Sequence, residues 1–198
     1  MALAYAGIRY ELREVVLRNK PEELLRLSPK ATVPVLVLEG VRVMEESLDI
    51  LHWALNRSDP AGWLDLTPAE KDVATRWAEQ NDGSFKQSLD RYKYSIRFPD
   101  ASQEAYRNEA LPFLNELDRA LGSGPFLFGG VMRWIDVALF PFIRQFAHVD
   151  REWFDAAPYS NLRRWLDAHL ESSLFKSVMK KYGAWQPGNE AIYFEPSA

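Results

Sequence analysis

The sequence contains no cysteine, and this absence removes several kinds of chemistry from its residues. Disulfide bonds, thiolate metal sites and a cysteine nucleophile all need the missing side chain. A chain without cysteine fits a reducing compartment, so we expect a cytoplasmic location. The three histidines, His52, His148 and His169, lack metal-ligand spacing, and we predict packing or surface roles for them and no metal site.

Three further features are missing from the sequence. It has no run of ~18 apolar residues, which a membrane-spanning helix needs, and its first residues lack the basic region of a signal peptide. The net charge is −4, from 24 basic and 28 acidic residues, so the chain also lacks the basic field that general nucleic-acid binding requires. We therefore expect neither a membrane nor a nucleic acid among its partners.

The remaining composition is that of a globular protein with many aromatic residues. The 198 residues include 13% aromatics, among them 7 Trp. This length is sufficient for one large domain or two small ones with a proper core. The aromatic content indicates interfaces or aromatic-lined clefts in addition to the core.

Residues 1–56 have a mixed α/β pattern. Met1–Ala6 are helix formers, and Gly7 stands where a left-handed helix cap belongs. Alternating apolar residues predict a strand over about 8–16, and Pro21 followed by two glutamates predicts a helix start. The segments "VLVL" and "VRVM" flank Glu39-Gly40, which is typical of a hairpin turn, and "ESLDILHWAL" has helical periodicity.

The rest of the chain is predicted to be helical. Residues 57–66 form a Pro- and Gly-containing linker, and "TPAE" at Thr67–Glu70 is a capping box that starts a long helix to about residue 94. We expect an all-helical domain over 67–185 and an irregular tail over 186–198. The fold class is therefore α/β followed by all-α.

Two short motifs in the first part carry candidate chemistry. In "ATVPVL", a cis peptide before Pro34 would turn the backbone N–H and C=O of Val33 outward to pair with an extended peptide; the alternative is a trans proline opening a strand. In "EES", Ser47 and the free N–H groups of a helix start form an anion site, while Glu46 suits an ammonium; the alternative is a simple helix cap. Lys20 is a candidate to bind a carboxylate of a ligand; the alternative is a solvated lysine.

The order of these motifs resembles the glutathione transferase superfamily over residues 1 to about 185. "NKPEE", "SPKATVPVL" and "EES" are most similar to its omega-like and bacterial cysteine-type members. The resemblance implies a thioredoxin-like N-terminal domain that binds glutathione as cosubstrate, followed by an all-helical domain. It further implies that Val33 pairs with the cysteinyl part of glutathione, Pro34 is cis, Glu46 and Ser47 hold the γ-glutamyl end, and Lys20 reaches a carboxylate.

The resemblance also bears on what the sequence lacks. "MALAYAGI" resembles the second half of the family's first helix, so the family's first strand and its catalytic Cys, Ser or Tyr would precede Met1. We expect the native protein to be an enzyme for glutathione conjugation or thiol transfer that is longer than these 198 residues, and we expect the 198 residues alone to be inactive or nearly so. The alternative is a non-catalytic transferase-like binding or dimerisation module; a relative of intracellular chloride channels is a distant third possibility. The expected partners are glutathione, a small electrophile or disulfide, and a second copy in a homodimer.

In the helical part, one stretch resembles a binding face and another a structural motif. Residues at steps of three to four along the long helix would face a second-substrate cleft, or else the core: Trp77, Asn81, Phe85, Ser88 and Tyr92. "MRWIDVALF" resembles the family's helix-capping motif, with Asp136 in place and Arg133 where a hydroxyl residue stands in the family. We predict a folding role for Asp136.

Overall fold

The computed structural model describes residues 1–38 and 42–194, and the chain divides into two compact units. The N-terminal unit comprises Met1–Ala61 with Ser173–Ala198, and the helical unit comprises Gly62–Ser172. The chain therefore returns to its first unit after passing through the second, which corrects the expected single helical domain over 67–185. The expected hairpin turn at Glu39-Gly40 lies outside the described residues.

The N-terminal unit begins with a short helix, α1 (Ala2–Tyr5). Gly7 follows it in the left-handed conformation, with φ of 67°. The N–H of Ile8 donates to the carbonyl of Leu3 at 3.0 Å, and the N–H of Gly7 to that of Ala4 at 3.1 Å, which is the Schellman pattern of helix ends. The predicted glycine cap is confirmed.

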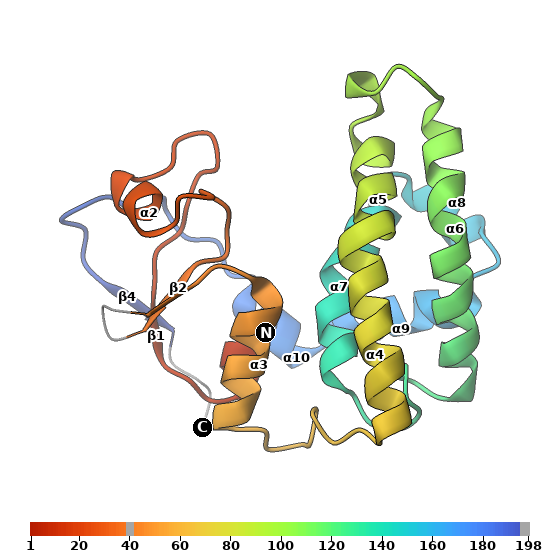
Figure 1. The fold of residues 1–198 in the computed structure, drawn as a ribbon, viewed down its shortest axis with the longest axis horizontal. Coiled ribbons are helices and arrows are strands. Elements are labelled where there is room, and N and C mark those ends of the chain that lie inside the picture. Colours follow the sequence, from red (N-terminus) through yellow and green to blue (C-terminus); the bar gives the residue numbers. More distant parts are fainter. Residues whose placement is uncertain (39–41, 195–198) are drawn as a thin grey trace. The chain divides into compact units, whose positions relative to one another are not determined.

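The remaining elements of the first 61 residues are short, as Figure 1 shows. They are β1 (Tyr10–Leu12), α2 (Glu22–Leu27), β2 (Leu36–Leu38), β3 (Arg42–Met44) and α3 (Ser47–Arg57). Strands β2 and β3 pair antiparallel, with Leu36 opposite Met44. The apolar side of α3, formed by Ile50, Leu51, Ala54 and Leu55, is buried and faces α1 in the core of this unit.

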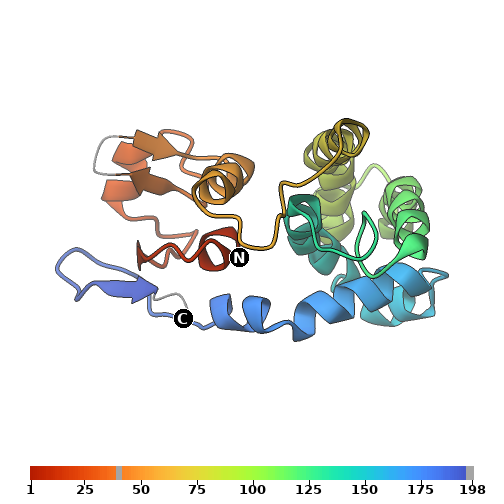
Figure 2. The same cartoon turned by 90° about the horizontal axis from the view of Figure 1, so that it is seen from below.

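A C-terminal strand completes the N-terminal unit. Helix α10 (Ser173–Val178) contacts α1, and β4 (Ile192–Phe194) pairs antiparallel with β1. Figure 2 shows this dark blue segment beside the red segment that holds α1 and β1. Within the described residues, the strands form two separate two-stranded sheets, β1–β4 and β2–β3. The expectation of an irregular tail over 186–198 is thus wrong for residues 192–194.

The helical unit is built around one long helix with a wider turn in its middle. Helix α4 (Pro68–Gln80) continues through the π-helical turn η1 (Asn81–Phe85) into α5 (Lys86–Lys93). At its start, Thr67 Oγ1 accepts from the N–H of Glu70 at 3.3 Å, and a Glu70 carboxylate oxygen accepts from the N–H of Thr67 at 2.8 Å. The predicted capping box is confirmed. The other elements are η2 (Ser95–Arg97), α6 (Gln103–Ala120), η3 (Leu121–Ser123), α7 (Trp134–Ala147), α8 (Arg151–Ala156) and α9 (Ser160–Glu171).

Asp136 organises the start of α7. It is fully buried, and its carboxylate accepts hydrogen bonds from the N–H groups of Leu127 and Arg133 and from the indole of Trp165, at 3.0, 2.9 and 2.8 Å. The reciprocal bond of the cap comes from the main chain, because the N–H of Asp136 donates to the Arg133 carbonyl at 3.0 Å. The Arg133 side chain instead donates to the carbonyl of Gly62. These contacts are consistent with the folding role that the sequence predicts for Asp136, and that role stays a prediction.

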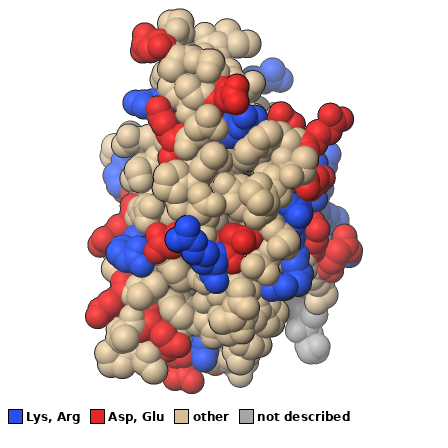
Figure 3. Space-filling model, turned by 90° about the vertical axis from the view of Figure 1, so that its right-hand side faces the viewer, with Lys and Arg blue, Asp and Glu red and all other residues tan. Residues whose placement is uncertain are grey.

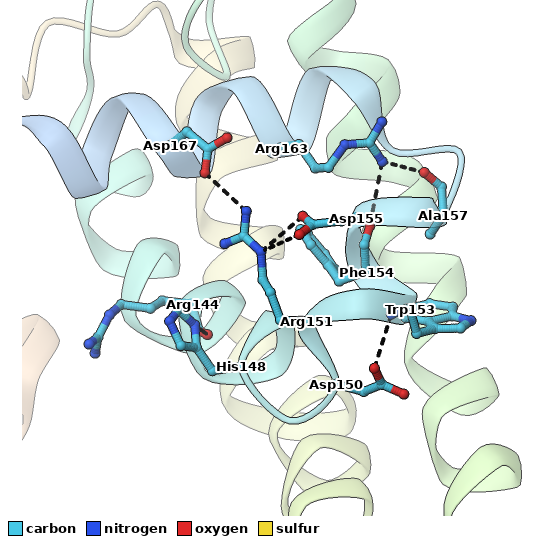
Figure 4. A network of polar contacts seen from close by, with 10 residues as sticks. All are labelled: Arg144, His148, Asp150, Arg151, Trp153, Phe154, Asp155, Ala157, Arg163 and Asp167. Carbon is cyan, nitrogen blue, oxygen red and sulfur yellow. Dashed lines mark hydrogen bonds and ion pairs between the residues drawn. The ribbon is translucent and has the colours of Figure 1, made fainter.

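Helices α8 and α9 are joined by the polar network in Figure 4. Arg151 donates to Asp155 on its own helix at 2.9 Å and to Asp167 on α9 at 3.3 Å. Arg163, from α9, donates to the main-chain carbonyl of Ala157 at the end of α8. These contacts attach the short helix α8 to α9.

One face of the molecule carries charged side chains of both signs. On the face shown in Figure 3, basic and acidic side chains are interspersed among broad uncharged stretches. Among the described residues, no helix combines the length and apolar character needed to cross a membrane.

Candidate functional site

The start of α3 holds two of the residues that the sequence singles out. Glu46 is the N-cap residue in an extended conformation, and Ser47 is the first helical residue. The first intrahelical bond runs from the N–H of Ile50 to the Glu46 carbonyl at 3.1 Å. The N–H groups of residues 47–49 precede that bond, so they are the donors that a helix start offers to an anion. The positive end of the helix dipole adds to this preference.

Two side chains that the sequence interpretation missed complete this region. Lys30 Nζ lies 2.6 Å from Glu46 Oε1, and this ion pair raises the pKa of Lys30. Ser28 is fully buried and its hydroxyl donates to Glu45 Oε1 at 2.5 Å. Both come from the loop after α2, which the Ser28–Glu45 bond attaches to the chain just before α3.

The sequence contained a signal for Ser28 and Lys30, because both stand in "SPKATVPVL", in the loop that leads to the Val-Pro motif. The loop turns sharply at Ala31, which has φ of 53° although it is not glycine. Its N–H donates to the Ser28 carbonyl at 2.8 Å. The turn lies directly after Lys30, so it sets the direction in which the chain proceeds to the Val-Pro motif.

The Val33–Pro34 peptide bond is cis, as the sequence interpretation expected. Val33 is 45% exposed, and β2 begins two residues after Pro34. The motif and the α3 start therefore belong to the same unit, with Ser28 and Lys30 on the loop that leads to the motif. The ligand roles of Val33 and Pro34 stay a prediction.

Lys20 lies apart from these contacts in the chain. It follows a tight turn in which the N–H of Asn19 donates to the Val16 carbonyl at 2.8 Å, and it precedes α2. Contacts among the described residues do not join Lys20 to Glu46 or Ser47. Its proposed bond to a carboxylate stays a prediction.

The predicted second-substrate face lies in the interior of the helical unit. Trp77, Asn81, Phe85, Ser88 and Tyr92 are all buried, with 7% exposure or less. Phe85 packs against Phe113 and Phe146 at ring distances of 5.0 and 5.8 Å.

The other members of this face also bond or pack within the same unit. The Trp77 indole donates to Glu116 at 2.8 Å, and the Ser88 hydroxyl donates to Glu109 at 3.4 Å. The Tyr92 ring lies 5.1 Å from that of Phe146. These contacts correspond to the core alternative, and a role in a cleft stays a prediction.

Comparison with known proteins identifies the family of the chain. The family "Glutathione S-transferase, N-terminal domain" matches residues 1–57, and "Glutathione S-transferase, C-terminal domain" matches residues 100–168. A probable glutathione S-transferase GSTU1 from Oryza sativa subsp. indica is 32% identical over 161 residues, which is 76% of this chain and 69% of the relative. The chain belongs to the glutathione S-transferase superfamily.

Other relatives agree with this assignment. The probable glutathione S-transferase parA of Nicotiana tabacum is 32% identical over 148 residues, or 74% of this chain and 66% of the relative. The chain thus aligns with about two thirds of the length of these plant proteins. The curated matches include several plant U-type transferases, so the comparisons support the superfamily rather than the omega-like and bacterial members in particular.

Solved structures confirm the fold. A Pseudomonas fluorescens glutathione transferase family member with two glutathione bound has a TM-score of 0.74 at 21% identity, over 88% of this chain and 83% of the other. Glutathione transferase Omega 3C from Trametes versicolor has a TM-score of 0.69 at 20% identity, over 91% and 82%. The protein combines a thioredoxin-like N-terminal domain that has small sheets with an all-helical C-terminal domain.

Proposed function

We propose that the protein is a glutathione-binding transferase whose N-terminal unit holds the γ-glutamyl end of glutathione at the start of α3. The observation that carries this proposal is that Glu46 and Ser47 stand at the start of α3, in the part of the chain that matches the family's N-terminal domain. The ligand's carboxylate would receive hydrogen bonds from the Ser47 hydroxyl and the N–H groups of residues 47–49. Its ammonium would pair with Glu46, which places both charges of an α-amino acid side by side.

The rest of the tripeptide would lie along the loop before β2. The backbone of Val33 would pair with the cysteinyl part beside Pro34, and Lys20 would approach a carboxylate. Within the superfamily, the bound thiol is used for conjugation to a small electrophile or for thiol transfer to a disulfide. We propose these as the reaction classes of the protein, in a cytoplasmic homodimer.

A binding role with little turnover is the second candidate, and the N-terminal tyrosines favour it. The Tyr5 hydroxyl donates to Asp59 at 2.8 Å and accepts from the N–H of Ala61 at 2.6 Å, so it serves the packing of α1. The Tyr10 ring is stacked on Phe194 at 5.0 Å. With no cysteine in the sequence, we expect these 198 residues to bind glutathione but to activate its thiol weakly.

Calorimetry with glutathione tests the binding site. Ser47→Ala removes a hydrogen bond to the ligand's carboxylate, and Glu46→Gln removes the negative charge that pairs with its ammonium. Each change is expected to weaken binding about tenfold. Ser58→Ala, at the opposite end of α3, is the matched control and should leave the affinity unchanged. Unchanged affinity in both site variants would sink the assignment.

The Lys30–Glu46 ion pair allows a second test. The Lys30 ammonium is paired with the carboxylate to which the ligand's ammonium would bind. Lys30→Met should therefore strengthen glutathione binding severalfold, and the gain should vanish with an analogue that lacks the γ-glutamyl amino group. A gain that is equal for both ligands would show that Lys30 does not compete with the ammonium. Conjugation of an activated aryl chloride, followed by absorbance, then separates the transferase from the binding role.

A further inference from the structure

The C-terminal segment forms a preshaped clip on the first strand of the N-terminal unit. Residues 186–189 make a turn in which the N–H of Asn189 donates to the Gln186 carbonyl at 3.0 Å and the N–H of Gln186 to the Asn189 side chain at 2.7 Å. Pro187 and Gly188, with φ of 87°, occupy its centre, as a type II turn requires. This local order reduces the entropy that the segment loses when it docks.

Both arms of the clip bond to the strand region around β1. Before the turn, the N–H of Trp185 donates to the Glu14 carbonyl at 2.9 Å, and the Arg13 guanidinium lies 4.5 Å from the Trp185 ring centre. After the turn, Ile192–Phe194 pair with Tyr10–Leu12. The clip therefore follows the chain from Arg9 to Glu14.

Aromatic contacts lie on both faces of this two-stranded ribbon. Tyr10 stands opposite Phe194, and their rings stack at 5.0 Å with 9° between the planes. On the other face, the Arg9 guanidinium lies 3.9 Å from the centre of the Tyr193 ring. Such contacts are needed, because a two-stranded ribbon alone is marginally stable in water.

The clip nevertheless lies on the surface. Ile192 and Tyr193 are 39% and 45% exposed, and Trp185 and Phe194 are half-buried. Residues 179–184, which join the clip to α10, have no regular secondary structure. The clip is thus partly exposed and is joined to α10 by a short irregular connection.

We propose that the edge of β1 is a binding site for an extended peptide strand, and that its resident ligand is the protein's own segment Trp185–Phe194. The peptide class is defined by the contacts: a backbone that adds antiparallel to Tyr10–Leu12, an aromatic ring opposite Tyr10 and a second ring within reach of Arg9. Strand addition of this kind takes its affinity from main-chain bonds and its specificity from alternate side chains. The occupied edge is also shielded from pairing with other chains.

Occupancy in the intact chain does not require a strong intrinsic affinity. A short connection holds the segment near its site at an effective concentration on the order of millimolar. A segment that binds in the micromolar range would be almost fully docked in the intact chain and would still leave once detached. Detachment is therefore the direct way to expose the site.

The experiment starts from the full chain, with a protease recognition sequence inserted into residues 179–183. After folding, the connection is cut, the fragment is removed by gel filtration at low concentration, and amide exchange is followed by NMR. We expect exchange at Tyr10–Leu12 to become at least tenfold faster, while the helices of the helical unit keep their protection. Unchanged exchange at Tyr10–Leu12 after loss of the fragment would overturn the proposal.

A labelled synthetic peptide of residues 184–194 is then added back. It should restore the protection of Tyr10–Leu12, and its binding is measured by fluorescence anisotropy. Phe194→Ala in the peptide should weaken binding about two- to tenfold, the range of an aromatic pair, while Glu190→Ala is an exposed control within about twofold of the parent.

The decisive control is a peptide that carries both Ile192→Pro and Tyr193→Pro. In an antiparallel strand, the N–H groups of neighbouring residues point alternately toward the partner strand and away from it. The double change therefore removes whichever N–H of residues 192 and 193 would donate to β1. This peptide should neither bind nor protect. If the double-proline peptide binds as well as the parent peptide, the edge of β1 is not a strand-binding site. The same conclusion follows if the parent peptide fails to restore the protection of Tyr10–Leu12, even when the cut protein has lost order around β1.

Discussion

Replacing His169 with leucine is expected to make the protein more resistant to acid. His169 is 1% exposed on α9, and among the described residues neither ring nitrogen has a hydrogen-bond partner. Its ring stacks on Phe140 at 4.9 Å and meets Trp165 at 4.7 Å. Leucine has a similar volume and no polar atoms to bury, so the change at neutral pH should stay within about 1.5 kcal/mol.

The acid effect follows from where the proton binds. Burial lowers the pKa of His169 from 6.5 to about 4. Between these values the unfolded chain takes up a proton that the folded protein excludes, so the free energy of unfolding falls as the pH falls. The difference in pKa corresponds to about 3 kcal/mol, which is present above about pH 6.5 and is lost as the pH drops through about 4.

Asp136 acts in the opposite direction over an overlapping range. Burial raises its pKa from 3.8 to about 6, against the hydrogen bonds that favour the carboxylate. The folded protein then holds a proton that the unfolded chain has released, so this contribution is full at low pH and is lost as the pH rises through about 6. The wild-type profile alone therefore understates the effect of His169, and the comparison with the variant isolates it.

Urea unfolding of the wild type and His169→Leu, from about pH 7.5 to about pH 4.5, measures the difference. We expect the variant to gain relative stability steadily below about pH 6.5. Leu162→Met, a buried change on the same helix without a titrating group, should give a constant offset at all pH values. Parallel curves for His169→Leu and the wild type, or a His169 ring NMR signal that titrates near 6.5, would refute the reasoning.

Three further substitutions test structural contacts. Asp136→Asn leaves one carbonyl oxygen for three donors, and should cost about 2–4 kcal/mol in urea unfolding; an unchanged midpoint would contradict the capping role. Tyr5→Phe removes the hydroxyl between Asp59 and the N–H of Ala61, and hydrogen exchange should show the N-terminal unit opening more easily by about 1–2 kcal/mol. Thr67→Ala removes the capping hydroxyl, and thermal unfolding should show a loss of about 1 kcal/mol.

The features that local rules govern could be predicted from the sequence. The Gly7 cap, the Thr67 capping box and the Asp136 cap each depend on residues within five positions of one another, and the structure contains all three. The burial of His169 also had a local signal. Leu162, Trp165, Leu166 and His169 recur at helical spacing, and all four are buried.

The pairing of β1 with β4 could not be predicted in the same way. The segment "QPGNEAIYF" contains a turn dipeptide followed by strand-prone residues, which was signal enough for a short strand near the end of the chain. Its partner lies about 180 residues away, however, and local sequence does not say which edge a strand joins. The division into units shares this difficulty, because it depends on the same return of the chain.

In the candidate site too, local features could be predicted from the sequence and contacts with distant residues could not. Helix chemistry identifies Glu46 and Ser47 as the groups at the start of α3, since a cap is a local feature. The ion pair with Lys30 arises from a loop 16 residues earlier, and only the folded chain brings its ammonium within 2.6 Å of Glu46. An ammonium held at that carboxylate mimics the charge that the proposed ligand would bring. The structure thus makes the Lys30→Met experiment the sharpest test of the site, because it asks whether a ligand cation and a protein cation compete for one carboxylate.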